Sequence, residues 1–377
     1  MSSSDKKPWI ETPLIESSTL SKHAGCRIFL KLELLQPSGS FKSRGIGNLI
    51  LSELQKNSNK GKTVHFFSSS GGNAGLAAVH AARDLGCPCT VIVPHSTKPM
   101  MIAKLRDAGA SDVIQHGASW FEADSYLRRE FIENQVVSDS GSGQESADAG
   151  LRRDSVNVYV PPFDHPLIWE GAASMVEEMA RQLPPRRSDK EGASFPADVV
   201  VCSVGGGGLF NGVVEGIEQH LKRTTSMMSG DTARRHQPVR VLAVETKGAD
   251  SLAYSLRQGK LSSLTEITSQ ATSLGALQVA QKTFTNASSP PYGIEVISVV
   301  GSDAEAAKGS LRLADETRLQ VELACGIGLE VATGQRLRKA IPDLKPETRV
   351  VVIVCGGSNI TSEMLAEYRA KLQGGWE

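Results

Sequence analysis

One lysine stands in a setting that would make its amine a nucleophile. Lys42 lies in the segment QPSGSFKSRG, residues 36–45, which contains Phe41 and small hydroxyl residues but no acid to pair with it. The segment is rich in turn-forming residues and leads into a predicted helix. Desolvation near a helix N-terminus lowers the pKa of an amine, which then attacks a carbonyl carbon to form a Schiff base. The alternative is an ordinary exposed lysine in the first turn of a helix.

Glycines gather where predicted strands lead into the segments that follow them. Of the 36 glycines, eight form three such junctions: Gly71-Gly72, Gly205-Gly206-Gly207-Gly208 and Gly356-Gly357. In open parallel sheets ligands bind beyond the carboxyl ends of the strands, and glycine lets the backbone approach them closely. Four consecutive glycines before an amphipathic helix predict a phosphate site at that helix N-terminus. The alternative is a tight turn with close packing.

A nicotinamide dinucleotide is one candidate for that phosphate. Residues 199–245 predict a strand, a glycine turn, a helix, a second strand and a terminal acid, Glu245. However, Phe210 stands where the third small residue of the dinucleotide motif belongs, and Glu245 lies about twice as far downstream as the usual ~20 residues. This interpretation also leaves the other two glycine junctions without a role.

The elements that must position these residues alternate between apolar strands and helices. The predicted strands are Thr63–Phe67, Pro88–Val93, Asp112–Ile114, Asp198–Val204, Val239–Val244 and Arg349–Cys355. The predicted helices are Asn73–Leu85, Lys98–Ala108, Trp120–Val136, Leu209–Leu221 and Thr361–Leu372. Strands that are apolar throughout and separated by helices indicate parallel sheets covered on both faces. We therefore predict an α/β fold, with surface loops at 138–154, 184–196 and 222–238.

Composition excludes several classes of protein. The 377 residues carry 41 Lys+Arg against 41 Asp+Glu, so no excess of charge favours nucleic acid or a membrane surface. No apolar run approaches the ~20 residues that span a bilayer, and the first residues lack the features of a signal or transit peptide. Six cysteines are too few for a disulfide scaffold, so we expect a cytoplasmic protein with reduced thiols.

Five motifs together resemble one enzyme family. SGSFKSRG, SSSGGNAG, PPFDHPLIWEG, SVGGGGL and VCGGSN occur in the order typical of pyridoxal phosphate (PLP) enzymes of fold type II, the serine/threonine dehydratase family. The similarity runs from about Thr12 to Leu372. PPFDHPLIWEG and Cys355 are most similar to the eukaryotic L-serine dehydratase branch. The resemblance implies two open, twisted, mostly parallel sheets flanked by helices. It also implies a large PLP-binding domain (1–46 and 158–377) and a small substrate or lid domain (47–157).

The resemblance also implies a role for each candidate residue. Lys42 carries the cofactor and removes the substrate α-proton, and Phe41 stacks on the pyridine ring. The loop that receives the substrate carboxylate is Ser70, Gly71, Gly72 and Asn73, and Asn73 also reaches the ring hydroxyl. Backbone N–H groups of Gly205, Gly206, Gly207, Gly208 and Leu209 hold the phosphate. Cys355 faces the ring nitrogen, and because a thiol is a weak partner for it, the weaker electron sink favours elimination over transamination.

A potassium ion is a further implied ligand. The aligned positions are Glu245, Ala249, Ser251, Leu274 and Ala276. Most of the ligand atoms would be backbone carbonyl oxygens, which suit a hard cation. Because any residue supplies a carbonyl, only Glu245 and Ser251 offer side-chain support.

The implied reaction is β-elimination of L-serine to pyruvate, and of L-threonine to 2-oxobutanoate, with release of ammonia. The resemblance places it in amino-acid catabolism and gluconeogenesis, in a cytoplasmic homodimer, and the short sequence after the last motif favours a catabolic enzyme. Gly71 stands where liver serine dehydratases often have Ala, which predicts a looser fit and a slower enzyme. The alternatives are a serine racemase, a β-replacement enzyme, a nicotinamide dehydrogenase and a non-catalytic amino-acid sensor.

Overall fold

The computed structural model describes residues 6–134, 155–185, 195–226 and 237–376. Contacts divide the chain into two compact units, one formed by Met1–Ile10 and Gln36–Gly171 and the other by Glu11–Leu35 and Ala172–Glu377. The small domain expected at 47–157 lies within the first unit, which also takes in residues 36–46 and 158–171. These flanking segments pack on each other: a Cβ added at Gly45 would lie 2.6 Å from the carbonyl oxygen of Ile168.

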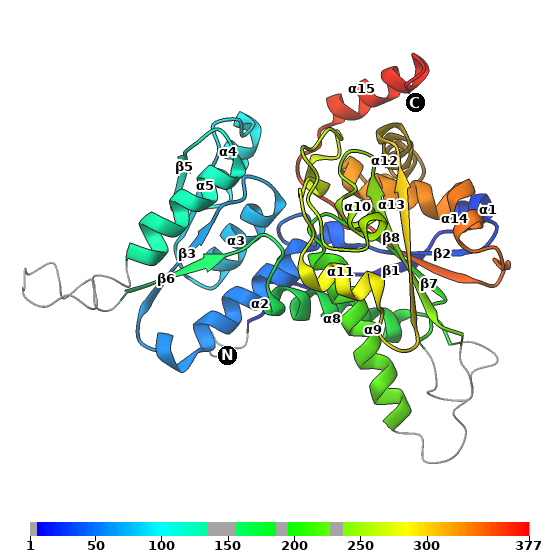
Figure 1. Ribbon diagram of the computed structural model, residues 1–377, viewed down its shortest axis with the longest axis horizontal. Coiled ribbons are helices and arrows are strands. Elements are labelled where there is room, and N and C mark those ends of the chain that lie inside the picture. Colours follow the sequence, from blue (N-terminus) through cyan, green and yellow to red (C-terminus); the bar gives the residue numbers. More distant parts are fainter. Residues whose placement is uncertain (1–5, 135–154, 186–194, 227–236, 377) are drawn as a thin grey trace, which may run out of the picture. The chain divides into compact units, whose positions relative to one another are not determined.

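The first unit is built on a four-stranded parallel sheet with the strand order β5-β4-β3-β6 (Figure 1). Its strands are β3 (Thr63–Ser68), β4 (Cys89–Val93), β5 (Asp112–Gln115) and β6 (Ser155–Val160). Its helices are α2 (Lys42–Gln55), α3 (Asn73–Asp84), α4 (Pro99–Asp107) and α5 (Trp120–Leu127), with the short turns η3 (Asn57–Asn59) and η4 (Arg128–Glu133).

Strand β3 is held on both of its faces. Val64 and Phe66 point into a core that they share with α2 and α3. Phe67 points the other way and packs with Ala123 and Leu127 of α5. Successive side chains of a strand alternate between the two faces of the sheet, which explains this division. The loop that follows Ser68 therefore starts from a firmly anchored strand end.

The second unit contains a six-stranded sheet with the order β1-β2-β10-β7-β8-β9. Strand β1 (Leu14–Glu16) is antiparallel to β2 (Arg27–Lys31), and the remaining pairs are parallel: β7 (Val199–Ser203), β8 (Val239–Thr246), β9 (Ile294–Gly301) and β10 (Arg349–Ile353). The helices are α1 (Ser18–Ala24), α8 (Pro166–Gln182, which begins in the first unit), α9 (Gly208–Ser226), α10 (Ser251–Gln258), α11 (Gln281–Ser288), α12 (Asp303–Thr317), α13 (Leu323–Thr333), α14 (Gln335–Ala340) and α15 (Ser362–Gln373). Short turns form at η2 (Glu33–Leu35) and η5 (Thr272–Leu274).

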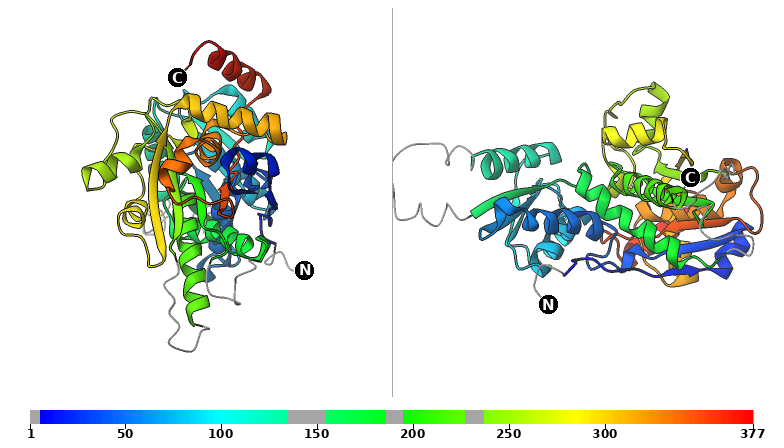
Figure 2. Two further views of the ribbon diagram at one scale, coloured as in Figure 1. Left: turned by 90° about the vertical axis from the view of Figure 1, so that its right-hand side faces the viewer. Right: turned by 90° about the horizontal axis from the view of Figure 1, so that it is seen from below.

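Helices cover the larger sheet, as the views in Figure 2 show. Helix α13 contacts β7, β8 and β10, while α9 contacts β7 and β9. All residues of β7 and β10 are buried. The predicted α/β class, with mostly parallel sheets flanked by helices, is confirmed. Sequence patterns missed β1, β2, β6 and β9, and β1 and β6 have no continuous buried run that would have marked them.

Predicted surface loops had mixed outcomes. Residues 138–154 lie outside the described part of the chain, and so do 186–194 of the loop expected at 184–196. The prediction of a loop at 222–238 was wrong for its first residues, because α9 continues through Ser226. Among the described residues, no helix combines the length and the apolar character needed to cross a membrane.

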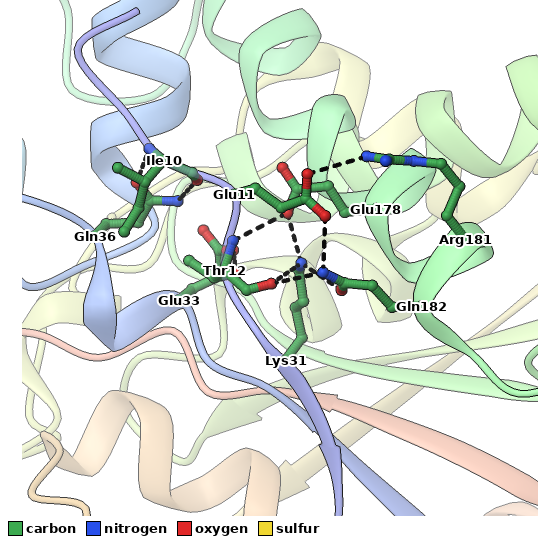
Figure 3. A network of polar contacts seen from close by, with 9 residues as sticks. All are labelled: Ile10, Glu11, Thr12, Lys31, Glu33, Gln36, Glu178, Arg181 and Gln182. Carbon is green, nitrogen blue, oxygen red and sulfur yellow. Dashed lines mark hydrogen bonds and ion pairs between the residues drawn. The ribbon is translucent and has the colours of Figure 1, made fainter.

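A buried lysine ties β2 to α8 in the second unit (Figure 3). The Lys31 amine, fully excluded from solvent, donates to the Thr12 carbonyl oxygen at 2.7 Å and to the Glu178 carboxylate at 2.5 Å. It also donates to the Gln182 side-chain oxygen at 3.0 Å. Because a buried charge is costly without such partners, this cluster holds the strand and the helix in one arrangement.

Candidate active site

Lys42 is the first residue of α2, as the turn-rich segment before it predicts. Its side chain is half-buried, and its Nζ donates a hydrogen bond to the carbonyl oxygen of Pro162 at 2.5 Å. The same nitrogen lies 5.4 Å from the centre of the Phe41 ring. Pro162 belongs to the PPFDHPLIWEG motif, so two of the five motifs meet at this amine. The sequence offers no signal for that contact, because a backbone carbonyl can come from any residue type.

The turn before Lys42 is held by hydroxyl groups. Gly39 has φ +75° and donates its N–H to the Gln36 carbonyl oxygen, while the Ser38 and Ser43 hydroxyls lie 2.8 Å apart. Ser40 is buried, and its hydroxyl has no hydrogen-bond partner among the described residues. An orphaned buried hydroxyl beside a half-buried amine is consistent with a polar ligand that completes the set.

The expected substrate loop connects β3 to α3, which begins at Asn73. The Gly72 N–H donates to the Ser70 hydroxyl at 3.3 Å. A Cβ added at Gly75 would lie 1.9 Å from the Ser70 carbonyl oxygen, so the loop turns tightly over the first turn of the helix. A helix N-terminus presents N–H groups that have no acceptor within the helix, which suits a carboxylate.

Gly71 has a specific neighbour. A methyl group at this position would lie 2.8 Å from Thr97 Cγ2 and 3.2 Å from Val93 Cγ1. The space that an alanine would need is therefore taken by Thr97. There is thus no empty gap beside Gly71, and unfilled space does not support the looser substrate fit that the missing methyl group predicts.

The four consecutive glycines join β7 to α9, which begins at Gly208. Gly207 has φ +101°, and a Cβ there would lie 1.8 Å from Thr283 Oγ1. A Cβ at Gly205 would lie 3.2 Å from Leu274 Cα. Close packing thus explains two of the glycines. The first N–H groups of α9 have no acceptors within the helix, and an anion site requires such donors.

Cys355 follows β10 and is buried. A hydrogen bond with the Cys325 thiol, burial and the nearby Glu322 carboxylate raise the pKa of the Cys355 thiol well above its usual range. The thiol is therefore neutral. A neutral thiol is what the sequence-based role of Cys355, a weak partner for a ring nitrogen, requires.

Glu322 organises the loop after Cys355 and was missed from sequence. Its carboxylate accepts the Asn359 N–H at 2.8 Å and the Ser273 hydroxyl. A Cβ at Gly357, where φ is +115°, would lie 2.3 Å from Glu322 Oε1. The same side chain thus contacts the loop that carries Cys355 and the turn that precedes Leu274. No motif marks it, because its partners come from distant segments.

The candidate cation residues occupy two segments of the second unit. Glu245, at the end of β8, is fully buried, and its carboxylate accepts the N–H groups of Leu252 and Ala253, both at 2.8 Å. Burial raises the pKa of Glu245 to about 8. The Ser251 hydroxyl is buried and has no partner among the described residues. This pair of oxygen groups suits a hard cation when Glu245 is ionised, and a cation bound there would lower the raised pKa of Glu245 again.

Further contacts relate these two segments. The Thr246 and Ser269 hydroxyls lie 2.8 Å apart, and Ser269 leads into the turn that carries Leu274. Leu274 in turn packs on Gly205. Ala249 and Leu274 are buried, and Ala276 is half-buried. In the part of the chain that the structure describes, no group of three or more His, Cys, Asp or Glu side chains forms a metal site.

Each unit, considered separately, carries residues suited to one part of PLP. The first unit supplies the half-buried amine, its neighbouring aromatic ring and the loop 70–73. The second supplies the glycine-run helix N-terminus and a neutral thiol. An amine for an aldehyde and an anion site for a phosphate are the two anchors that this cofactor needs.

Comparisons with known proteins agree with that fit. A family model described as pyridoxal-phosphate dependent enzyme matches residues 6–356. An L-serine dehydratase of Saccharomyces cerevisiae (strain AWRI1631) is 40% identical over 358 residues, which cover 94% of each chain. A serine dehydratase-like protein of Rattus norvegicus is 39% identical over 370 residues, covering 96% of this chain and 94% of the relative.

A solved structure shares the same architecture. The fungal L-serine ammonia-lyase from Rhizomucor miehei superposes with a TM-score of 0.78 at 31% identity, over 97% of this chain and 99% of that chain. Since the family model spans most of the sequence and the relatives match over nearly their whole length, the chain belongs to the family of pyridoxal-phosphate-dependent enzymes.

Proposed function

We propose that this protein is a PLP-dependent ammonia-lyase that converts L-serine to pyruvate and L-threonine to 2-oxobutanoate, releasing ammonia. The observation that carries the proposal is the 40% identity to an L-serine dehydratase over 94% of both chains. A relative described as a catabolic L-serine/threonine dehydratase, 37% identical over 363 residues, supports the second substrate.

Each candidate residue then has a chemical task. When bound, PLP supplies an aldehyde that combines with amines and a ring that withdraws electrons from the adjacent carbon. Lys42 Nζ would anchor the aldehyde and, once the substrate amine has released it, would accept the α-proton of the substrate, and Phe41 would pack on the ring. The backbone N–H groups of 205–209 would hold the phosphate, and Asn73 would bind the ring hydroxyl.

The residues that contact the substrate lie in the loop between β3 and α3. Ser70, Gly71, Gly72 and Asn73 bind the amino-acid carboxylate through N–H groups and the Ser70 hydroxyl. The neutral thiol of Cys355 would be a weak hydrogen-bond partner for the ring nitrogen and would leave it uncharged, which would favour loss of the β-hydroxyl over transamination. The released 2-aminoacrylate hydrolyses to pyruvate and ammonia.

Purified holoenzyme tests the proposal directly. Pyruvate and 2-oxobutanoate are measured by a coupled assay with L-serine and L-threonine, and the visible absorbance of the bound cofactor is recorded before and after borohydride. We expect oxo-acid formation and an absorbance that borohydride abolishes. Lys42→Ala should lose both, while Lys56→Ala, at the exposed far end of α2, should keep both.

The alternatives give different results in the same assay. Consumption of L-serine without oxo acid contradicts the ammonia-lyase, and D-serine or a β-substituted product then identifies racemisation or replacement. Bound cofactor without turnover indicates an amino-acid sensor. Membership of the PLP family argues against the nicotinamide dehydrogenase considered for residues 199–245.

A potassium site is the second part of the proposal. Its ligands are the Glu245 carboxylate and oxygen atoms of Ala249, Ser251, Leu274 and Ala276. A ligand that binds only the folded protein at about tenfold its Kd adds about 1.4 kcal/mol to stability. We expect the melting temperature to rise in KCl relative to NaCl at equal ionic strength. Glu245→Gln should abolish that difference, and Glu266→Gln, on the surface, should preserve it.

We further propose that the enzyme is a cytoplasmic homodimer that acts in amino-acid catabolism and gluconeogenesis. Six free thiols support a reducing compartment. Size-exclusion chromatography with light scattering tests the dimer, and a monomer at working concentrations would contradict it.

A further inference from the structure

A buried carboxylate lies behind the loop proposed to bind the substrate. Asp124, on α5, accepts the Ser69 hydroxyl and the Tyr159 hydroxyl on the same oxygen, each at 2.6 Å. Its other oxygen accepts the Arg128 Nε at 2.8 Å. Asp124 is 7% exposed and Ser69 is fully buried. All of these residues belong to the first unit.

The cluster joins three elements at the carboxyl end of β3. Ser69 directly follows β3, Tyr159 lies on β6, and Asp124 lies on α5. Tyr159 is paired with Phe67 across the sheet, and Phe67 packs on α5 through Ala123 and Leu127. The helix that carries Asp124 is therefore fixed against the same strand whose end it binds.

The hydrogen bonds in the cluster are of the strong, charge-assisted kind. A carboxylate that accepts two hydroxyls and a guanidinium forms shorter and stronger bonds than neutral pairs do. Burial and the Asp124 carboxylate raise the pKa of Tyr159, so its hydroxyl remains a donor. The Arg128 guanidinium, whose side chain is about half exposed, lies 4.0 Å from the centre of the Tyr159 ring.

The substrate loop is thereby held at its first residue. Ser69 immediately precedes Ser70, whose carbonyl oxygen sits against Gly75 and whose hydroxyl accepts the Gly72 N–H. One side of the loop is thus fixed by the helix α3 and the other by Asp124. Preorganised donors bind a carboxylate more tightly because less conformational entropy is lost on binding.

We propose that Asp124 is a positioning residue, which holds Ser69 so that the loop 70–73 presents its donors to the carboxylate of the amino-acid substrate. This inference rests on the proposed function. It assigns to α5 a role in substrate affinity that is separate from cofactor binding, since neither Asp124 nor Ser69 is a cofactor residue.

Two ligands that differ only in the carboxylate test the role. The holoenzyme is mixed rapidly with L-serine or with 2-aminoethanol over a range of concentrations, and binding is read from the change in visible absorbance before L-serine is turned over. Removal of the Ser69 hydroxyl in Ser69→Ala should weaken L-serine binding about tenfold, as expected for loss of a hydrogen bond to a charged group. Binding of 2-aminoethanol should change less than about twofold, because it has no carboxylate to misplace.

The neighbouring serine provides a matched control. Ser68 is fully buried, and its hydroxyl has no partner among the described residues, so Ser68→Ala removes the same group without breaking a hydrogen bond. It should leave both affinities unchanged. Asp124→Asn keeps an oxygen that can accept both hydroxyls and should retain more L-serine affinity than Asp124→Ala.

Each outcome decides the proposal. A loss confined to L-serine in Ser69→Ala and Asp124→Ala, with partial rescue in Asp124→Asn, supports it. An equal loss for both ligands, or no loss for either, overturns the positioning role while wild-type oxo-acid formation leaves the proposed function intact. A wild-type protein that neither binds L-serine nor forms oxo acid refutes the proposed function and this inference together.

Discussion

The side-chain amine of Lys42 donates a hydrogen bond to the carbonyl oxygen of Pro162, 120 residues further along the chain. The contact joins the start of α2 to the PPFDHPLIWEG motif. It leaves the amine half-buried beside the Phe41 ring. The contact uses only the donor capacity of the amine, whereas attack on an aldehyde needs its lone pair. A cationic replacement should therefore keep the contact and lose the chemistry.

Lys42→Arg separates these two roles. The guanidinium still donates to a carbonyl oxygen but stays charged at all working pH values, so it cannot attack an aldehyde or accept a proton. We expect the variant to fold with a melting temperature close to that of the wild type. It should show no borohydride-sensitive absorbance, and oxo-acid formation should fall by at least about 10³-fold. A variant that kept a tenth of the wild-type rate would contradict the assignment.

Gly207→Ala should destabilise the protein and weaken cofactor binding. The left-handed backbone conformation costs an alanine about 1–2 kcal/mol, and the clash with Thr283 adds to this at Gly207. Gly259→Ala is the matched control, because φ is +65° there but nothing lies within 4 Å of the added Cβ. Urea unfolding and a PLP titration measure the two effects. Equal losses of stability in both variants would show that the contact with Thr283 is unimportant.

Cys355 should tolerate a neutral replacement but not a charged one. Cys355→Ser keeps a small neutral partner, and we expect kcat/KM for L-serine to stay within about threefold of the wild type. Cys355→Asp would bury a carboxylate near Glu322, so the free energy of unfolding of this variant should fall by about 3 kcal/mol or more. Steady-state kinetics and thermal unfolding check both results. Full activity and stability in Cys355→Asp would disprove the neutral environment.

The Lys31–Glu178 pair should be worth far more to stability than a surface pair on the same helix. Glu178→Ala leaves a buried ammonium without its carboxylate partner, which costs about 3–5 kcal/mol. Arg181→Ala removes an exposed pair with Glu11 and should cost less than about 1 kcal/mol. Urea unfolding of the two variants gives the comparison. Similar free energies of unfolding would mean that the buried network contributes little.

Local patterns in the sequence were enough for much of the fold. Largely apolar runs marked β4, β7, β8 and β10, because strands buried on both faces need apolar residues at most positions. The turn chemistry before Lys42 and the glycines before α9 marked two helix starts. Strands such as β1 and β6, with few buried residues, escaped detection because their pattern resembles that of loops.

Residue types and spacing also singled out the amine and the glycine run as candidates, because each is chemically unusual where it stands, and the family resemblance added the thiol. Only the tertiary structure decided what surrounds them: the Pro162 carbonyl at Lys42, Thr97 at Gly71, Glu322 and Cys325 around the Cys355 loop, and Asp124 behind Ser69. These partners are distant in sequence and chemically ordinary. Their roles follow from the strand order and the helix packing that bring them together. No local sequence pattern encodes that strand order or that packing.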